Sequence, residues 1–319
     1  MAEASRGLRE VTGVMVRIGT VHVIGLGALV ALAVVPALPG MRAVLFPLTL
    51  TNIMATLAIA WNLLFGYAGL LSLGHSFFFG AAGYASAILS KYYGIPVPIA
   101  MVLGAAVSSG LAALVGLPSL KLRGHYFVLV TLVLPAVAYQ LTNALDFLGG
   151  HDGIFGVPPL VRDSYLVYVG SLVLMLASLI ASFYVTRSKL GMEMLSIRED
   201  EEAAKAMGVD VPRVKLYALT ISAFISGLAG AYWAHLNGVI SPAVYELEKA
   251  SMPLLMSVLG GKGTLLGPVI GAYVLQTLFE SLKIEAIVMA RLFIFAAATF
   301  VIYRLFPQGL IGILRRAIT

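Results

Sequence analysis

The sequence predicts an all-α integral membrane protein, a polytopic helical bundle of about ten transmembrane segments. Three observations support this fold class. The composition is 60% hydrophobic and only 11% charged, whereas a soluble domain has about 25% charged residues. Apolar stretches that approach the roughly 20 residues needed to span a bilayer recur from Ile18 to Phe306. No polar segment is long enough for a second, soluble domain, so residues 18–306 are assigned to one transmembrane domain.

Hydropathy divides this domain into candidate spans whose ends are good to a few residues: about 18–38, 43–65, 74–90, 95–117, 124–145, 165–185, 216–236, 250–260, 264–282 and 286–305. Arg6, Arg9 and Arg17 precede the first apolar run as in a signal peptide. Because that run is long enough to span and no soluble domain follows it, we interpret it as an uncleaved first helix. Segment 250–260 is too short to cross alone and is expected to be a half-helix or a re-entrant segment.

The basic residues predict the orientation, because cytoplasmic loops carry an excess of Lys and Arg. Residues 1–17 are expected to be a cytoplasmic N-terminal segment and residues 307–319 a cytoplasmic tail. Threading the spans from there places the following on the cytoplasmic side: Lys121, Arg123, loop 187–215, Lys262, Arg304, Arg315 and Arg316. The external side, which includes loop 146–164, receives fewer basic residues: Arg42, Lys91, Arg162, Lys249 and Lys283.

Two glycine-rich stretches interrupt the spans: "GYAGLLSLGHSFFFGAAGY" (Gly66–Tyr84) and "GGKGTLLGPVIGAY" (Gly260–Tyr273). Each continues into a helix with small residues on one face: Gly80, Ala81 and Gly83 in the first, Gly267 and Gly271 in the second. One interpretation is close helix packing through small residues. The other is a broken helix whose exposed backbone lines a substrate path. Both stretches run in the same direction, so an inverted repeat is not supported.

Loop 187–215 holds 12 of the 36 Asp, Glu, Lys and Arg residues of the chain. Ser196 and Glu199 have the spacing of a capping box, and acidic residues follow in a first turn, where the helix dipole favours them. Gly208 supplies a stop, and Pro212 would prevent the helix from resuming soon after. We therefore predict a cytoplasmic helix of about three turns.

The side chains of this predicted helix fall into two sets. The pairs Arg198–Glu202 and Glu201–Lys205 are spaced for i,i+4 ion pairs. Ala203, Ala204 and Met207 form a small apolar strip. The helix can be a solvated connector, a helix lying in the lipid interface, or a docking helix for a cytoplasmic partner. The interfacial helix would need a larger apolar face and more Lys or Arg.

Several chemistries have no support in the sequence. The chain contains no cysteine. "GGKGT" lacks the Gly-Lys-Ser/Thr order of a phosphate-binding loop, because Gly263 separates Lys262 from Thr264. His22, His125 and His235 are scattered without metal-ligand spacing, so no metal site is predicted. The basic residues flank apolar segments, and no nucleic-acid partner is predicted.

"EAAKAMG" (Glu202–Gly208) resembles the cytoplasmic EAA coupling loop of bacterial ABC importer permeases, which favours the docking helix. The resemblance extends through an ordered series of motifs that covers about residues 45–313: "GYAGLLSLGHSFFFGAAGY", "LRGHYFVLVTLVL", "LTNALDFLGGHDGIFGVPPL", "RSKLGMEMLSIREDEEAAKAMGVD", "SGLAGAYWAHLNGVISP", "VLGGKGTLLGPVIGAY" and "FPQGLIG". Together they are similar to the branched-chain amino acid ABC transporter permease family, specifically its LivM-type subunit. The loop "GGHDGIFGVPP" departs from the family pattern at His151 and Asp152, which leaves the substrate unassigned.

The resemblance implies an importer in a bacterial inner membrane. The partners would be a LivH-type permease, two cytoplasmic ABC ATPase subunits and a periplasmic substrate-binding protein. ATP and Mg²⁺ would bind those ATPases, and this chain would carry no cofactor and no catalytic residue. The ATPase contact is carried over to Glu202, Ala203, Ala204 and Gly208, with Ser196 and Glu199 at the start of the helix. Nucleotide-driven closure would then move the two flanking spans.

For the translocation pathway we predict Gly69, Ser72, Gly74, His75, Thr131 and Gly263. The Ser72 hydroxyl, and backbone groups left without helical partners at the glycines, can hydrogen-bond the charged ends of a zwitterion. The Ser72 hydroxyl can equally bond the backbone of its own helix. His75 is expected to cap or pack rather than to titrate. Asp152, on the outer side, is a candidate contact for the binding protein, or part of a plain structured loop.

Related permeases move branched-chain amino acids, and others move urea, amides or small aromatic acids. An ion-coupled secondary transporter is the main rival, but such carriers hold carboxylates inside the membrane. Here no Asp or Glu lies in the middle of a span: Asp146, Glu280 and Glu285 lie at ends. A membrane enzyme would need a cluster of catalytic side chains, and none is found. A channel would give the docking helix no partner.

Overall fold

The computed structural model describes residues 42–119, 125–281, 293, 297, 300, 304 and 309–312. Several predictions concern residues outside this set. They are the N-terminal segment 1–17, span 18–38, most of span 286–305 and of tail 307–319, and the basic residues Lys121, Arg123, Lys283, Arg315 and Arg316.

The regular elements of the described chain are helices, apart from one pair of two-residue strands. In order, the long and short helices and the strands are α2 (Arg42–Asn62), η2 (Leu63–Tyr67), α3 (His75–Lys91), α4 (Val97–Ser119), α5 (His125–Ala144), η3 (Asp146–Leu148), β1 (Ile154–Phe155), α6 (Ser164–Arg187), α7 (Lys189–Glu199), α8 (Glu201–Ala206), α9 (Val211–Asn237), β2 (Val239–Ile240), η4 (Pro242–Tyr245), α10 (Leu247–Gly260) and α11 (Gly267–Ser281). β1 pairs with β2 in antiparallel fashion.

Five helices are long and apolar enough to cross a membrane, namely Arg42–Tyr67, Val97–Ser119, Tyr126–Ala144, Ser164–Arg187 and Val211–Asn237. They coincide with five of the predicted spans, so the prediction of an all-α, multi-pass membrane protein is confirmed. The predicted spans 74–90, 250–260 and 264–282 are the shorter helices α3, α10 and α11, of 17, 14 and 15 residues. The total of ten spans stays a prediction.

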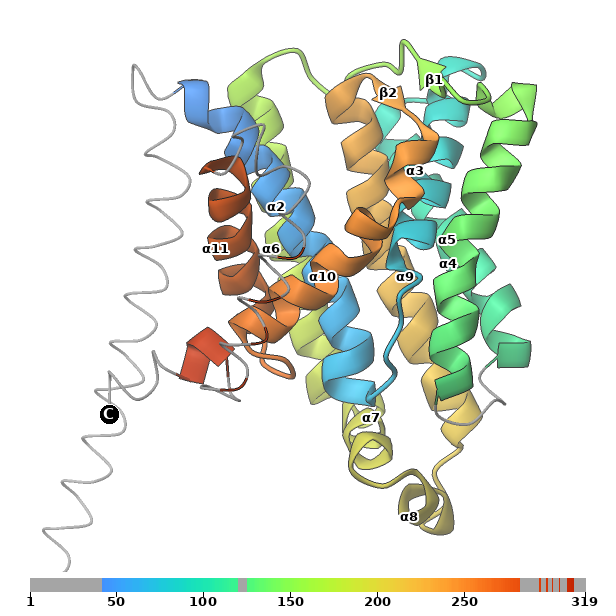
Figure 1. Cartoon of the computed structure of the whole chain (residues 1–319), viewed down its shortest axis with the longest axis vertical. Helices are drawn as coiled ribbons and strands as arrows, with labels where there is room; N and C mark the ends of the chain where they lie inside the picture. Colours follow the sequence, from blue (N-terminus) through green and yellow to red (C-terminus); the bar gives the residue numbers. More distant parts are fainter. Residues whose placement is uncertain are drawn as a thin grey trace, which may run out of the picture.

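Figure 1 shows α7 and α8 beyond the long helices at one end of the molecule, and β1 and β2 at the other. We call these the α8 end and the β end. α2, α4 and α6 run toward the α8 end, whereas α3, α5 and α9 run toward the β end. This alternation agrees with the predicted threading. Basic residues gather at the α8 end, including Arg187, Lys189, Arg198, Lys205, Arg213 and Lys215.

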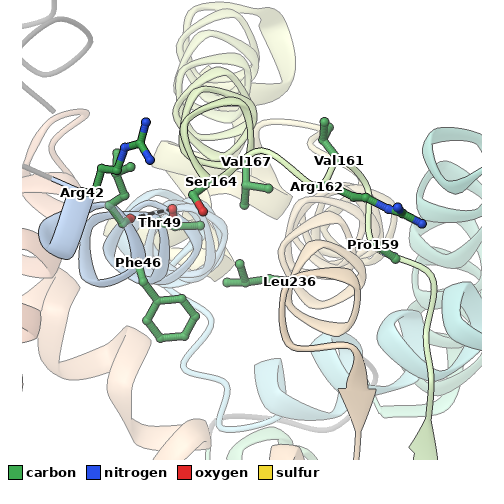
Figure 2. A pocket seen from close by; sticks show the side chains of 10 residues that line it. Arg42, Phe46, Thr49, Pro159, Val161, Arg162, Ser164, Val167 and Leu236 are labelled. Atoms are coloured by element: carbon green, nitrogen blue, oxygen red, sulfur yellow. Dashed lines mark hydrogen bonds between the residues drawn. The ribbon is translucent and has the colours of Figure 1, made fainter. Parts of the chain in front are cut away.

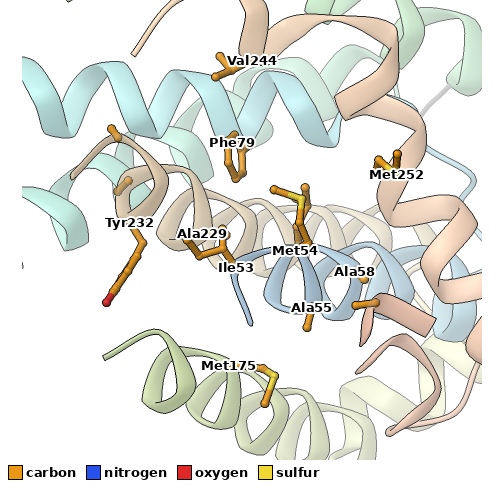
Figure 3. Close-up of a cluster of buried hydrophobic side chains, with 14 of the residues drawn as sticks. Ile53, Met54, Ala55, Ala58, Phe79, Met175, Ala229, Tyr232, Val244 and Met252 are labelled. Atoms are coloured by element: carbon orange, nitrogen blue, oxygen red, sulfur yellow. The ribbon is translucent and has the colours of Figure 1, made fainter. Parts of the chain in front are cut away.

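α2 lies at the centre of the packing. It contacts α6 on one side, α9 on another, and α10 and α11 on a third. α3, α4 and α9 all pack against one another. Figure 3 shows the main buried cluster, in which Ile53, Met54 and Ala58 of α2 lie near side chains of the other helices. The glycine-rich loop that follows α2 is therefore attached to a helix that contacts α6, α9, α10 and α11.

Glycines bring several helices into backbone contact. A Cβ on Gly83 of α3 would lie 3.0 Å from the Gly230 carbonyl oxygen of α9, and a Cβ on Gly230 would overlap the carbonyl of Phe79. Gly267 and Gly271 of α11 approach Gly261 and Met256 in the same manner. For these helical glycines the structure supports the packing interpretation.

Candidate functional site

The cytoplasmic helix predicted in loop 187–215 is in fact two short helices, α7 and α8, joined at Asp200. Ser188 caps α7 by accepting a hydrogen bond from Gly191 N at 3.5 Å. Asp200 caps α8, accepting from Glu202 N at 2.9 Å and Ala203 N at 3.0 Å. Gly208, with φ +87°, ends the unit as predicted, and Val209 N donates to Ala204 O at 3.1 Å. Such a left-handed residue after a helix favours glycine.

The predicted capping box is wrong. Ser196 lies inside α7, where its hydroxyl donates to Glu193 O at 2.8 Å. Glu199 is the last residue of α7 and pairs with Arg198, Nη2 to Oε1 at 2.6 Å. Asp200 takes the capping role because α7 continues three residues beyond Ser196 and the chain becomes extended only at Asp200.

Three further details of the prediction are corrected. The break at Asp200 puts Arg198 and Glu202 on different helices, so they do not have i,i+4 geometry. The predicted ion-pair partner of Glu201 was Lys205, whereas in the structure Glu201 accepts a hydrogen bond from Lys215 at 2.7 Å. The side chain of Lys215 is only 7% exposed. Pro212 does not delay the next helix: it lies in the first turn of α9, which begins at Val211. Proline is tolerated there because the first turn has no intrahelical partners for its amides.

α8 presents a mixed surface. Glu202, Ala203 and Gly208 are exposed, and Met207 is 86% exposed at the far end of the helix. Ala204 is 4% exposed and packs in the cluster that holds α8 to the body. The predicted apolar strip is therefore divided, with Ala204 as an anchor and Met207 as a projecting apolar side chain.

The two glycine loops meet near the α8 end. α2 ends in the π-helical turn η2, and the chain then leaves the helix at Gly69, with φ +71°. Asn62, which is 2% exposed, accepts from Gly263 N at 2.8 Å and donates to Thr264 O at 2.9 Å. The buried side-chain amide of Asn62 thus binds the backbone of the second glycine loop.

Arg198 of α7 reaches the same place. Its Nη1 donates to Gly66 O at 2.6 Å. A pocket of about 460 Å³ lies there, lined by Phe65, Gly66, Gly69, Arg198 and Lys262. Helix α7, the end of α2 and the loop before α11 therefore share one site, which we call the Arg198 junction.

The predicted pathway residues separate into two groups. Gly69 and Gly263 lie at the Arg198 junction. Ser72, Gly74, His75 and Thr131 lie together in a buried junction between α2, α3, α5 and α9. That they line a substrate path stays a prediction.

The buried junction is held by side chains that bond to backbone. The hydroxyl of Thr131 accepts from Leu73 N at 3.2 Å, and that of Ser72 accepts from Gly74 N at 3.2 Å. His75 Nε2 lies 2.7 Å from Ser222 Oγ. Because Ser222 donates its one proton to Ala60 O at 2.7 Å, His75 must be the donor to Ser222, which fixes the Nε2–H tautomer. His75 thus ties α3 to α9, as expected of a packing histidine.

At the β end, Asp152 is exposed in a turn next to β1, which is compatible with the predicted contact but does not test it. A pocket of about 420 Å³ also opens at this end and includes Arg42, Phe46, Arg162, Val167 and Leu236 in its lining. Figure 2 shows Arg42 and Arg162 on opposite sides of this pocket, with guanidinium groups that point away from each other. The two cations do not converge on one ligand position.

Sequence reasoning missed three residues of the site. Asn62 could have been noticed as an amide within an apolar helix. Arg198 was assigned only to a helical ion pair, and Met207 only to a helix face. Of the described residues, no group of His, Asp or Glu is arranged to hold a metal ion.

Comparison with known proteins identifies relatives of the chain. Residues 43–303 match the family described as "Branched-chain amino acid transport system / permease component". The chain is 30% identical over 266 residues to the high-affinity branched-chain amino acid transport system permease protein LivM of Salmonella typhimurium, covering 74% of this chain and 62% of that protein. It is 26% identical over 254 residues to the probable LivM of Methanocaldococcus jannaschii, covering 67% of this chain and 74% of that protein.

Another relative is the ribose import permease protein RbsC of Bacillus subtilis, which is 27% identical over 259 residues, 75% of this chain and 78% of that protein. The chain spans less than two thirds of the length of the Salmonella LivM protein that it matches. No solved structure matches the chain significantly.

Proposed function

We propose, from the premise that this chain belongs to the branched-chain amino acid transport system / permease component family, that it is the membrane-spanning subunit of an ATP-driven importer. It would pair with a LivH-type permease, receive substrate from a periplasmic binding protein, and pass it into the cytoplasm of a bacterial cell. The ATP and Mg²⁺ would be bound by two ABC ATPase subunits. The α8 end would face the cytoplasm and the β end, with Asp152, the binding protein.

The observation that carries this proposal is the α7–α8 unit. It is capped at Ser188 and Asp200 and stopped at Gly208, so its shape depends on its own residues. It projects beyond the bundle between two spans, α6 and α9 (Figure 1). Glu202, Ala203, Met207 and Gly208 give it an exposed surface of small, charged and apolar groups, which suits a cleft on a protein partner.

The names of the relatives support a proposal for the substrate class. The two LivM relatives are named for branched-chain amino acids, and we propose these as substrate. RbsC is named for ribose, so related permeases act on chemically different solutes. Urea, amides and small aromatic acids are the alternatives that the sequence leaves open.

Burial of charge bears on the rival mechanism. Among the Asp and Glu side chains that the structure describes, which do not include Glu280 and Glu285, none is buried. An ion-coupled carrier would be expected to hold a carboxylate within the membrane. We therefore favour ATP hydrolysis by a partner at α8, rather than an ion gradient, as the energy source for transport.

Site-directed cross-linking tests the ATPase contact, and the absence of cysteine from the chain makes it direct. Ala203→Cys on α8 and Tyr93→Cys at the β end, which is 69% exposed, are each co-expressed with the proposed permease and ATPase partners. With a short thiol-to-amine cross-linker, Ala203→Cys should join to an ATPase subunit and Tyr93→Cys should not. An intact complex in which Ala203→Cys gives no ATPase adduct would contradict the proposed contact.

A further inference from the structure

We propose that Arg198 is the positioning residue that carries movement of α7 and α8 to both glycine loops. Through these loops, Arg198 would control whether the helical bundle opens at the α8 end. This inference rests on the proposed function, because it assumes that a partner moves α8. It concerns the internal route by which that movement reaches the spans, rather than the partner contact itself.

The first link joins α7 to the end of α2. Arg198 Nη1 donates to Gly66 O at 2.6 Å, while Nη2 and Nε donate to Glu199 Oε1 at 2.6 and 3.2 Å. Carbonyls in the last turn of a helix have no intrahelical partner, and a cation there is favoured by the helix dipole. The guanidinium therefore takes the position that a following backbone amide would have, had α2 continued.

The second link is steric. A Cβ on Gly69 would lie 3.0 Å from Arg198 Cγ and 3.2 Å from its Cα, and Gly69 has φ +71°. A Cβ on Gly263 would lie 3.1 Å from Arg198 Nη1. Glycine on both sides lets the arginine pack directly against backbone of the two loops.

The third link makes the two loops one unit. Asn62 bonds both Gly263 N and Thr264 O, and the Lys262 ammonium lies 5.4 Å from the centroid of the Phe65 ring. Displacement of Arg198 is therefore transmitted to the end of α2 and, through Asn62, to the loop between α10 and α11.

Arg198, Gly66, Gly69, Phe65 and Lys262, which take part in these links, line the pocket of about 460 Å³ at the Arg198 junction. Arg198 forms one wall, and the backbone of Gly66 and Gly69 forms another. Its side chain is 35% exposed, so this wall of the pocket lies at the surface of the bundle. A movement of α7 must either pull the two loops along or open this pocket.

The test compares substrate transported with ATP hydrolysed in the reconstituted complex. Arg198→Ala should keep ATP hydrolysis but lower transport per ATP at least about tenfold, the scale of losing a charged hydrogen bond. Arg198→Lys should lie between Arg198→Ala and the wild type, because lysine keeps the charge but not the planar fork. Arg213→Gln is the matched control: it removes an exposed arginine of the same loop, outside α7 and α8, paired with Asp210 at 2.9 Å. Its ratio should equal that of the wild type.

The outcomes separate the inference from the proposed function. A wild-type complex without ATP-dependent uptake overturns the proposed function. A coupled wild type together with a normal transport-to-ATP ratio in Arg198→Ala overturns only the inference. A variant that lowers transport and hydrolysis in parallel, with an unchanged ratio, shows a structural role and also overturns it.

A second measurement keeps Arg198 in place, in case Arg198→Ala does not assemble. Spin labels are attached at Lys189→Cys in α7, Leu266→Cys in the loop before α11, and Tyr93→Cys at the β end, all three at exposed positions. On nucleotide binding, the 93–189 and 93–266 distances should change while the 189–266 distance stays constant. A 189–266 distance that changes as much as the other two, or three distances that do not respond to nucleotide, would overturn the inference.

Discussion

Asn62 is a buried amide at the last position of α2, and both ends of its side chain are bonded to backbone of another loop. Asn62→Leu would leave Gly263 N and Thr264 O without this partner. The expected loss is about 1–3 kcal/mol of unfolding free energy, the cost of unsatisfied polar groups. Thermal unfolding of the detergent-solubilised protein measures it.

Asn237 provides the matched control, because its amide also bonds backbone, to Trp233 O at 2.8 Å, but at an exposed helix end. Asn237→Leu should change stability by no more than about 0.5 kcal/mol. Equal losses in the two variants would mean that Asn62 has no special role in joining the glycine loops.

At this scale the sequence identified some residues and missed the partners of others. Gly208 was predicted correctly, since a glycine after a short polar helix has one common use. Ser196 and Asp200 are both good capping residues, and only the length of α7 decides between them. Arg198 could not be placed, because its partner Gly66 is 132 positions away in the chain.

Among the elements, α8 is the most sharply testable. Its six residues depend on the Asp200 cap, and loss of such a cap costs about 1 kcal/mol. Asp200→Ala should speed amide hydrogen exchange in α8 roughly fivefold. Ser196→Ala should leave α8 exchange unchanged, because Ser196 bonds within α7. A larger effect of Ser196→Ala would support the capping box instead.

The contact between α3 and α9 makes a second prediction at this scale. A methyl group on Gly230 would overlap the carbonyl of Phe79, and overpacking of this kind costs about 1–3 kcal/mol. Gly230→Ala should therefore lower the melting temperature. Gly110→Ala in α4 is the control, since nothing lies within 4 Å of its Cβ position and alanine favours a helix by about 1 kcal/mol. A Gly230→Ala variant as stable as the wild type would refute close packing at this site.

Helix prediction succeeded where length and hydropathy were sufficient, as in α4 and α6. It was less accurate where polar groups enter a helix. The span predicted at 216–236 begins five residues earlier, at Val211, because Lys215 is buried against the body and paired with Glu201. The pairing of a lysine with a distant carboxylate is not visible in local hydropathy.

At the scale of the whole molecule, the described helices pack around α2, and the interrupted segments gather at one point of this bundle. α2 is held by α6, α9, α10 and α11, yet its end is a π-helical turn bonded to Arg198. The sequence predicted the glycine loops separately. Their meeting at the Arg198 junction required three segments, from residues 62–69, 198 and 262–264, to come together.

The central claim is that this permease subunit moves solute only when partner ATPases act on its α8 end. The most direct measurement is uptake of radiolabelled leucine, delivered by the binding protein, into vesicles that contain the assembled complex, with the proton gradient collapsed. Uptake should require ATP on the ATPase side and should stop when the ATPase subunits carry an inactivated nucleotide site. Uptake that persists without ATP, or that follows an imposed ion gradient, would contradict the claim.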